Sequence, residues 1–265
     1  MKQVIICGDS FMSPVLSFPG SHFSQIFCQT LGYELTAYAR SGMSNAGITI
    51  QLNDAISKKP DLIIFNTTSF DRIEIPVVPP DSKYLSGPDQ AYKVTDLLYT
   101  QSTGLSSHYP WINIDPKIWS VSIADLLDHR KYDSRQDQYW NHNSMTHLDD
   151  IQDLHEKKQA ARTWFELLYD PRLKKMMDSF QLYGIIHKLH LSDIDYIWVH
   201  DSIYPDYYTP FTFLTEKNDL RKMIGGIINE NRSLPNQDPG YHTTIMGQQL
   251  IADVLVEHYQ NNFMP

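Results

Sequence analysis

The stretch QVIICGDSFMSP, residues 3–14, decides how the rest of the chain is interpreted. Residues 3–7 are mostly apolar and β-branched, and such a run predicts a buried β-strand. The strand is expected to end at Gly8, and an acid and a serine, Asp9 and Ser10, follow at once. A polar turn of this kind can be ordinary, or it can hold a serine hydroxyl where it can attack a carbonyl carbon.

Strands and helices alternate through the first part of the chain. Apolar residues at helical spacing predict helices over 21–31 and 44–57, and β-branched and aromatic runs predict strands over 33–39, 60–68 and, later, 193–201. This order is typical of a parallel sheet covered by helices on both faces. We therefore expect an α/β fold, a three-layer α/β/α sandwich of the flavodoxin-like kind with a parallel sheet of about five strands.

The middle of the chain predicts an insertion, residues 76–190, within a single domain that spans 1–265. Its first part, 76–115, is rich in Pro, Ser, Gly and Tyr and is expected to be extended. Residues 117–189 have the spacing of helices, beginning with IWSVSIADLLDH (118–129). After the last predicted strand, an aromatic-rich loop leads to a final helix from about Thr243.

Composition restricts the class of protein. The 265 residues are 42% hydrophobic, enough for a sizeable core, and the net charge of −9 argues against a surface that coats nucleic acid. Two cysteines suggest no disulfide framework. No signal-peptide pattern and no apolar run of ~20 residues are present, so we expect a cytoplasmic protein without a membrane partner. No oligomeric state is indicated.

Polar residues are expected to gather at one edge of the sheet. The carboxyl ends of parallel strands meet there, and ligand sites of open α/β sheets lie at that edge. Ser10 follows the first strand, and a serine attacks only when a base takes its proton and an acid orients that base. His242 precedes the last helix, and Asp238 lies four residues earlier. A loop that opens this C-terminal helix against the first strand could bring His242 to Ser10.

Three segments resemble blocks of the SGNH (GDSL-like) hydrolase family. They are GDSF (8–11), RSGMSNAGI (40–48) and DPGYHTTIMGQQLIADVL (238–255), and the resemblance covers residues 1–75 and 190–262. It implies that Ser10 is the nucleophile, His242 the general base and Asp238 the orienting acid. It implies neither a metal nor an organic cofactor.

The resemblance also implies an oxyanion hole. The family builds it from the serine amide, a backbone amide in the second block and an asparagine after the third strand. Asn45 falls where the second block has its amide-donating glycine, and Gly42 falls at the earlier turn glycine. The family's Gly-x-Asn-Asp after the third strand has no counterpart here, and counting from Asp61 puts Ser69 at the asparagine position. The Ser69 hydroxyl or the side chain of Asn45 could supply that hydrogen bond.

The implied function is hydrolysis of an ester through an acyl-enzyme on Ser10. A small acyl group, such as acetyl on a carbohydrate, is the implied substrate class. We expect His200, after the last predicted strand, and Tyr204, in the aromatic loop, to contact a small-molecule or glycan ester. Two alternatives stay open: a non-catalytic glycan-binding or scaffold protein of the same fold, and an acyltransferase that uses the same serine. A nucleotide-binding domain is disfavoured because no Gly-rich phosphate loop follows the first strand.

Overall fold

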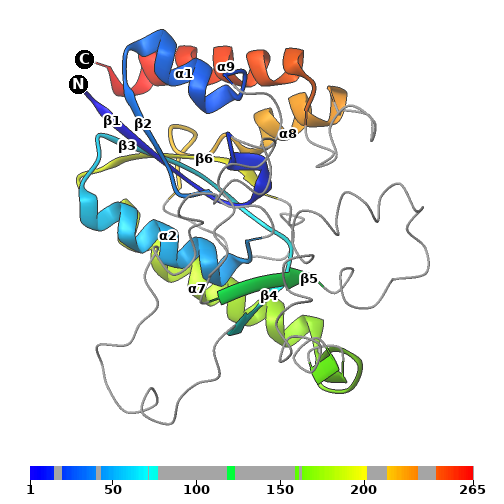
Figure 1. The fold of residues 1–265 in the computed structure, drawn as a ribbon. Helices are drawn as coiled ribbons and strands as arrows, with labels where there is room; N and C mark the ends of the chain where they lie inside the picture. Colours follow the sequence, from blue (N-terminus) through cyan, green and yellow to red (C-terminus); the bar gives the residue numbers. More distant parts are fainter. Residues whose placement is uncertain are drawn as a thin grey trace, which may run out of the picture.

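The computed structural model describes residues 1–14, 20–39, 43–70, 72–76, 118–122, 159–160, 163–201, 214–231 and 243–264. The strands are β1 (Gln3–Cys7), β2 (Glu34–Ala37), β3 (Leu62–Thr67), β4 (Arg72–Pro76), β5 (Ile118–Ser122) and β6 (Asp195–Asp201). The helices are the short 3-10 helix η1 (Ser10–Met12), α1 (Phe23–Leu31), α2 (Asn45–Lys58), α7 (Pro171–His190), α8 (Arg221–Glu230) and α9 (Ile245–Phe263). Figure 1 shows their arrangement.

Four strands form one parallel sheet in the order β2-β1-β3-β6. The expected α/β fold, with a parallel sheet between helices, is confirmed. The expected sheet has about five strands, whereas the described part of the chain contributes four to it. β1 and β3 are the two central strands, and the register pairs Cys7, the last residue of β1, with Phe65, two residues before β3 ends.

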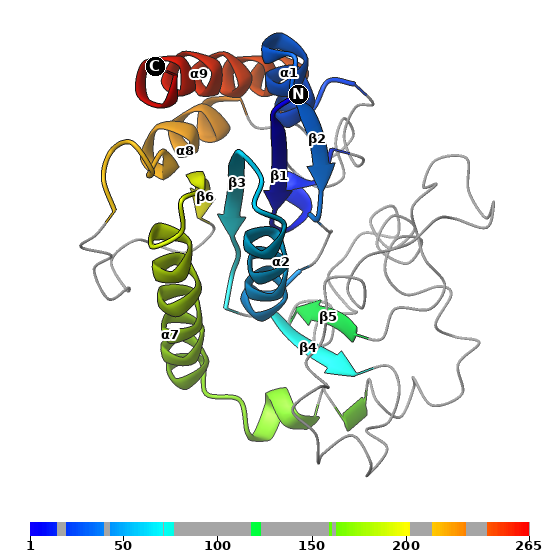
Figure 2. The same ribbon diagram turned by 90° about the vertical axis from the view of Figure 1, so that its left-hand side faces the viewer.

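Two helix layers cover the two faces of the sheet (Figures 1 and 2). Helices α1, α8 and α9 pack on one face and α2 and α7 on the other. Side chains of β1 alternate between the layers: Val4 and Ile6 lie in the cluster with α1 and α9, and Ile5 and Cys7 in the cluster with α2 and α7. Because both faces are buried, every residue from 4 to 7 has to be apolar, which is the pattern of the opening stretch.

Helix α7 forms part of the sandwich although it lies in the predicted insertion 76–190. Its side chains Leu182, Ile186 and Leu189 are fully buried in the cluster that also holds residues of α2. The prediction of helices over 117–189 is confirmed for this segment. The last helix of the predicted insertion, α7, therefore belongs to the layer that covers one face of the sheet.

Strands β4 and β5 form a separate two-stranded antiparallel sheet, and β5 lies where a helix was predicted. The expectation of a helix over 118–129 is wrong at its start, because Ile118–Ser122 is strand β5 and pairs with β4 in the register Arg72–Ser122 to Pro76–Ile118. The physical reason is the long-range pairing. Ile, Trp and Val suit a pleated strand, but IWSVS adjoins residues with helical spacing, and the ladder with β4 decides between the two. In Figure 2 this two-stranded sheet lies beside the end of α2.

The helices near the C-terminus differ in how well the sequence predicts them. The final helix is confirmed, with Thr244 as its N-cap and Ile245 as its first residue. Helix α8 is not predicted, because the adjacent Gly225 and Gly226 interrupt an apolar pattern that otherwise has helical spacing. Among the residues that the structure describes, no helix is both long and apolar enough to cross a membrane.

Candidate functional site

The candidate site lies at the carboxyl ends of β1 and β3. From this pair the strand order runs outward in opposite directions, to β2 on one side and to β6 on the other. Ligands of open α/β sheets bind in the crevice at such a switch point. The segments that leave the two strands there carry Ser10 after β1 and Thr68 and Ser69 after β3.

Ser10 begins the 3-10 helix η1 directly after the strand. Asp9 is the N-cap of η1, and its carboxylate accepts a hydrogen bond from the Phe11 amide at 3.0 Å. Two further bonds close the turn, from the Met12 amide to the Asp9 carbonyl and from the Ser13 amide to the Ser10 carbonyl, each 3.2 Å. Phe11 and Met12 are buried, while Ser10 is half-buried. The turn therefore presents this serine at the edge of the sheet.

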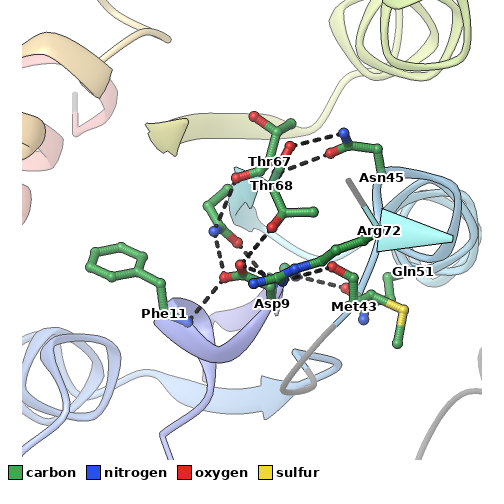
Figure 3. A network of polar contacts seen from close by, with 10 residues as sticks. Asp9, Phe11, Met43, Asn45, Gln51, Thr67, Thr68 and Arg72 are labelled. Carbon is green, nitrogen blue, oxygen red and sulfur yellow. Dashed lines mark hydrogen bonds and ion pairs between the residues drawn. The ribbon is translucent and has the colours of Figure 1, made fainter. Parts of the chain in front are cut away.

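A buried polar network surrounds Asp9 (Figure 3). One carboxylate oxygen accepts from the Asn66 amide at 2.8 Å as well as from Phe11. The other accepts from the Thr68 hydroxyl at 2.8 Å and from Arg72 Nη1 at 2.9 Å. Burial by itself raises the pKa of the Asp9 carboxyl, but Arg72 and the three hydrogen-bond donors outweigh it and hold the pKa below its usual value. Asp9 is therefore an ionised anchor of the turn.

Asn45, a predicted oxyanion residue, links the start of α2 to the end of β3. It is fully buried, accepts from the Thr68 amide at 2.9 Å and donates to the Thr68 carbonyl at 2.9 Å. Its second amide hydrogen goes to the carboxylate of Asp178 at 3.0 Å. Both side-chain hydrogens are thus donated within the protein. The backbone N–H of Asn45 is in the first turn of α2, where amides have no acceptor within the helix.

Two more predicted residues lie at the same edge. Ser69 is half-buried and follows Thr68, which contacts both Asp9 and Asn45. His200 is half-buried near the end of β6, and its ring packs on the ring of Phe11 with the centroids 4.8 Å apart. The structure therefore brings these residues together with the turn that carries Ser10.

Four predicted site residues lie outside the described residues: Gly42, Tyr204, Asp238 and His242. The chain next to His242 is described. Thr243 is fully buried, and the Thr244 amide donates to the Asn231 carbonyl at 2.9 Å before α9 begins.

Sequence reasoning missed two charged residues of the network, Arg72 and Asp178. Asp178 is almost fully buried on α7 and pairs with Lys174 at 2.5 Å. The sequence signal for Asp178 is its position four residues before the buried Leu182, which puts it on the apolar face of α7. The sequence signal for Arg72 is Asp9. A carboxylate directly after a buried strand needs a cation, and Arg72 is the first cationic residue after β3.

The site offers hydrogen-bond donors, a serine hydroxyl and a histidine ring. Within the described residues, no three histidine, cysteine or acidic side chains cluster in a way that could hold a metal ion. The serine hydroxyl is a group that can act as a nucleophile when a base takes its proton, and backbone amides can donate to negative charge.

Comparisons with known proteins give little further information. No model of a protein family and no curated protein matches the chain. Among solved structures, a protein assigned to the G-D-S-L family of lipolytic proteins from Desulfitobacterium hafniense DCB-2 is similar, with 18% sequence identity and a TM-score of 0.23. The similarity covers 25% of this chain and 39% of that protein. At these values it says nothing about activity.

Proposed function

We propose that this chain is a serine ester hydrolase that forms an acyl-enzyme on Ser10. The observation that carries the proposal is the position of this residue: a half-buried serine, on a turn fixed by hydrogen bonds, at the switch point of a parallel sheet. The proposed substrate is the ester of a small acyl group, such as acetyl on a carbohydrate.

The proposed reaction has two halves. The Oγ atom of Ser10 attacks the ester carbonyl while a ring nitrogen of His242 takes the hydroxyl proton, and Asp238 orients the imidazole. The tetrahedral intermediate collapses when His242 gives that proton to the leaving alcohol, which leaves the acyl group on Ser10. A water molecule, deprotonated by the same histidine, then attacks the acyl-enzyme and releases the acid.

The start of α2 supports the proposed oxyanion hole. Ser44 caps the helix by accepting from the amides of Ala46 and Gly47 at 3.1 and 3.4 Å, which leaves the Asn45 amide at the positive end of the helix. We assign the oxyanion to the backbone amides of Ser10 and Asn45, with the Ser69 hydroxyl as a third donor. Each such donor can stabilise the transition state by about 3 kcal/mol. Gly42 stays in the proposal as the turn glycine before them.

A chain of contacts supports His242 as the base. Gln248, in the first turns of α9, accepts a hydrogen bond from the Phe23 amide at the start of α1, at 2.9 Å. His22, the residue before Phe23, has its Nε2 atom 2.9 Å from the carbonyl oxygen of Phe11. Because a carbonyl oxygen only accepts, Nε2 is the donor of this hydrogen bond. The N-terminal end of α9, which follows His242, is thus tied through α1 to the turn that carries Ser10.

Labelling tests the nucleophile. The wild-type protein should react with a fluorophosphonate and hydrolyse p-nitrophenyl acetate, and Ser10→Ala should abolish both without lowering the melting temperature. Ser13→Ala is the matched control, because Ser13 ends the same turn but is buried. It should keep both activities, and peptide mapping should find the adduct on Ser10. A wild-type protein that neither labels nor hydrolyses short esters would contradict the proposal and favour a binding function.

Two histidine variants test the base. His242→Ala should lower kcat by about 1,000-fold, a typical size for loss of a general base. His200→Ala should act mainly on KM, because the His200 ring packs on Phe11 and is proposed to contact substrate. The wild-type rate should fall as pH drops through the ordinary histidine pKa of about 6.5. If His200→Ala removes activity and His242→Ala does not, His200 is the base.

A further inference from the structure

We propose that Arg72 is a positioning residue that fixes the turn of Ser10 relative to the start of α2. The inference rests on the proposed function, since it concerns the geometry of the oxyanion hole. Arg72 is the first residue of β4, so it ties the two-stranded β4–β5 sheet to the candidate site.

One nitrogen of Arg72 makes both contacts. Nη1 lies 2.9 Å from Oδ2 of Asp9 and 3.1 Å from the carbonyl oxygen of Met43. The side chain of Arg72 is 22% exposed and that of Asp9 is 5% exposed, so water screens this ion pair weakly. Figure 3 shows the Arg72 side chain extending to both partners.

The two partners lie one and two residues before the two proposed oxyanion donors, Ser10 and Asn45. Asp9 precedes Ser10 and caps η1, so a shift of its carboxylate moves the turn. Met43 precedes Ser44, the N-cap of α2, and the donor amide of Asn45 follows. The guanidinium therefore sets the separation of two backbone amides that must both lie about 2.7–3.1 Å from one oxyanion.

No other cation contacts the Asp9 carboxylate among the described residues. Without Arg72, the Asp9 carboxylate keeps three neutral donors, from Phe11, Asn66 and Thr68, but stays buried. A buried carboxylate that loses its counter-ion takes up a proton or draws in water, and either change releases the turn. Arg72 touches no reacting atom in the proposed mechanism, so it affects catalysis only through the positions of the Ser10 turn and the start of α2.

The test compares two arginines. Arg72→Ala should lower kcat for p-nitrophenyl acetate by about 100-fold, as expected for a misplacement of about 1 Å, with KM within about threefold of wild type. Its rate of fluorophosphonate labelling should fall by the same factor. Arg221→Ala is the matched control. Arg221 is the first residue of α8, its side chain is 19% exposed, and it pairs with Asp219 at 2.7 Å. It should lower stability and leave kcat unchanged.

Chemical rescue separates positioning from general loss of structure. Methylguanidinium should restore Arg72→Ala by at least tenfold in kcat, and methylammonium should restore it less. If Arg72→Ala does not fold, Arg72→Lys carries the test, and a kcat about tenfold lower at unchanged KM supports the inference.

Failure has two distinguishable forms. A wild-type protein that labels, together with Arg72 variants that label at the wild-type rate or lose no more kcat than Arg221→Ala, would overturn the role of Arg72 alone. A wild-type protein that neither labels nor turns over would overturn the proposed function, and the catalytic role of Arg72 with it.

Discussion

Replacing Gly8 with alanine should destabilise the fold and disrupt the candidate site together. Gly8 has φ of 150°, a backbone conformation that side chains rarely adopt, and it joins β1 to the turn of Ser10. A Cβ atom at this position would overlap Oδ1 of Asn66 and lie 2.5 Å from Cγ of Met12. Asn66 cannot simply retreat, because Oδ1 accepts from the Asp9 amide at 3.1 Å and its Nδ2 donates to Asp9 at 2.8 Å.

The expected loss follows from these contacts. A residue held at such a φ costs about 1–3 kcal/mol, and each buried hydrogen bond lost at Asp9 costs about 1–3 kcal/mol more. The sum for Gly8→Ala is about 4 kcal/mol if part of the network relaxes. For a domain of this size that lowers the melting temperature by roughly 10 °C. Fluorophosphonate labelling of Ser10 should fall as well, because the turn shifts with Asn66.

Gly184→Ala provides the matched control. Gly184 is exposed in the interior of α7, and a Cβ atom there meets nothing within 4 Å. Alanine favours a helix over glycine by about 1 kcal/mol, so this variant should melt about 2–4 °C higher than wild type. Thermal unfolding followed by circular dichroism measures both. If the free energy of unfolding of Gly8→Ala lies within about 1 kcal/mol of wild type, the backbone at Gly8 does not approach the side chain of Asn66 closely enough to exclude a Cβ atom.

Other contacts make further predictions. His22→Ala should lower the free energy of unfolding by about 2–4 kcal/mol, because it removes the N-cap of α1 and the donor to the buried Phe11 carbonyl. His22→Asn can cap the helix but cannot reach Phe11, so in thermal unfolding it should recover about 1 kcal/mol of that loss. Burial raises the pKa of Asp178 against the pull of Lys174, so the folded state holds its proton to higher pH, and the free energy of unfolding should fall as pH rises through that raised pKa. Asp178→Asn should remove this fall in urea titrations at several pH values. The pKa of Asp9 is lowered, so its contribution is present above the unfolded value of about 3.9 and is lost as pH falls through the folded pKa, a loss that Asp9→Asn should lack.

Local signals predicted the sandwich well. The apolar run at 3–7 became β1 with the same bounds, because both of its faces are buried. Gly32 ends α1 with φ of 68°, and Ser44 caps α2 through its hydroxyl. In each case the residues that determine the structure are neighbours in the sequence, so pattern and propensity suffice.

Long-range pairing was not predictable in the same way. IWSVS lies next to residues with helical spacing, and only its pairing with β4 makes it a strand. The bond between Arg72 and Asp9 joins residues 63 positions apart, and the bond between Asn45 and Asp178 joins residues 133 apart. A sequence shows that a buried acid needs a partner, but only the fold selects which one.

The network also bears on which acid would orient the proposed base, His242. Both oxygens of Asp9 accept from Phe11, Asn66, Thr68 and Arg72, and those of Asp178 accept from Lys174 and Asn45. Turning either carboxylate toward a histidine would break a buried bond, so we expect another acid to orient the proposed base.

Asp238, four residues before His242, and Asp201, at the end of β6, remain as candidates for the orienting acid. Because an amide at the acid position stabilises the wrong imidazole tautomer, Asp238→Asn should lower kcat by up to about 10,000-fold with little change in melting temperature. Asp201→Asn is the control and should stay within about tenfold of wild type. If the loss follows Asp201 instead, that residue holds the histidine. If both variants keep near-normal turnover, Ser10 and its base act as a dyad.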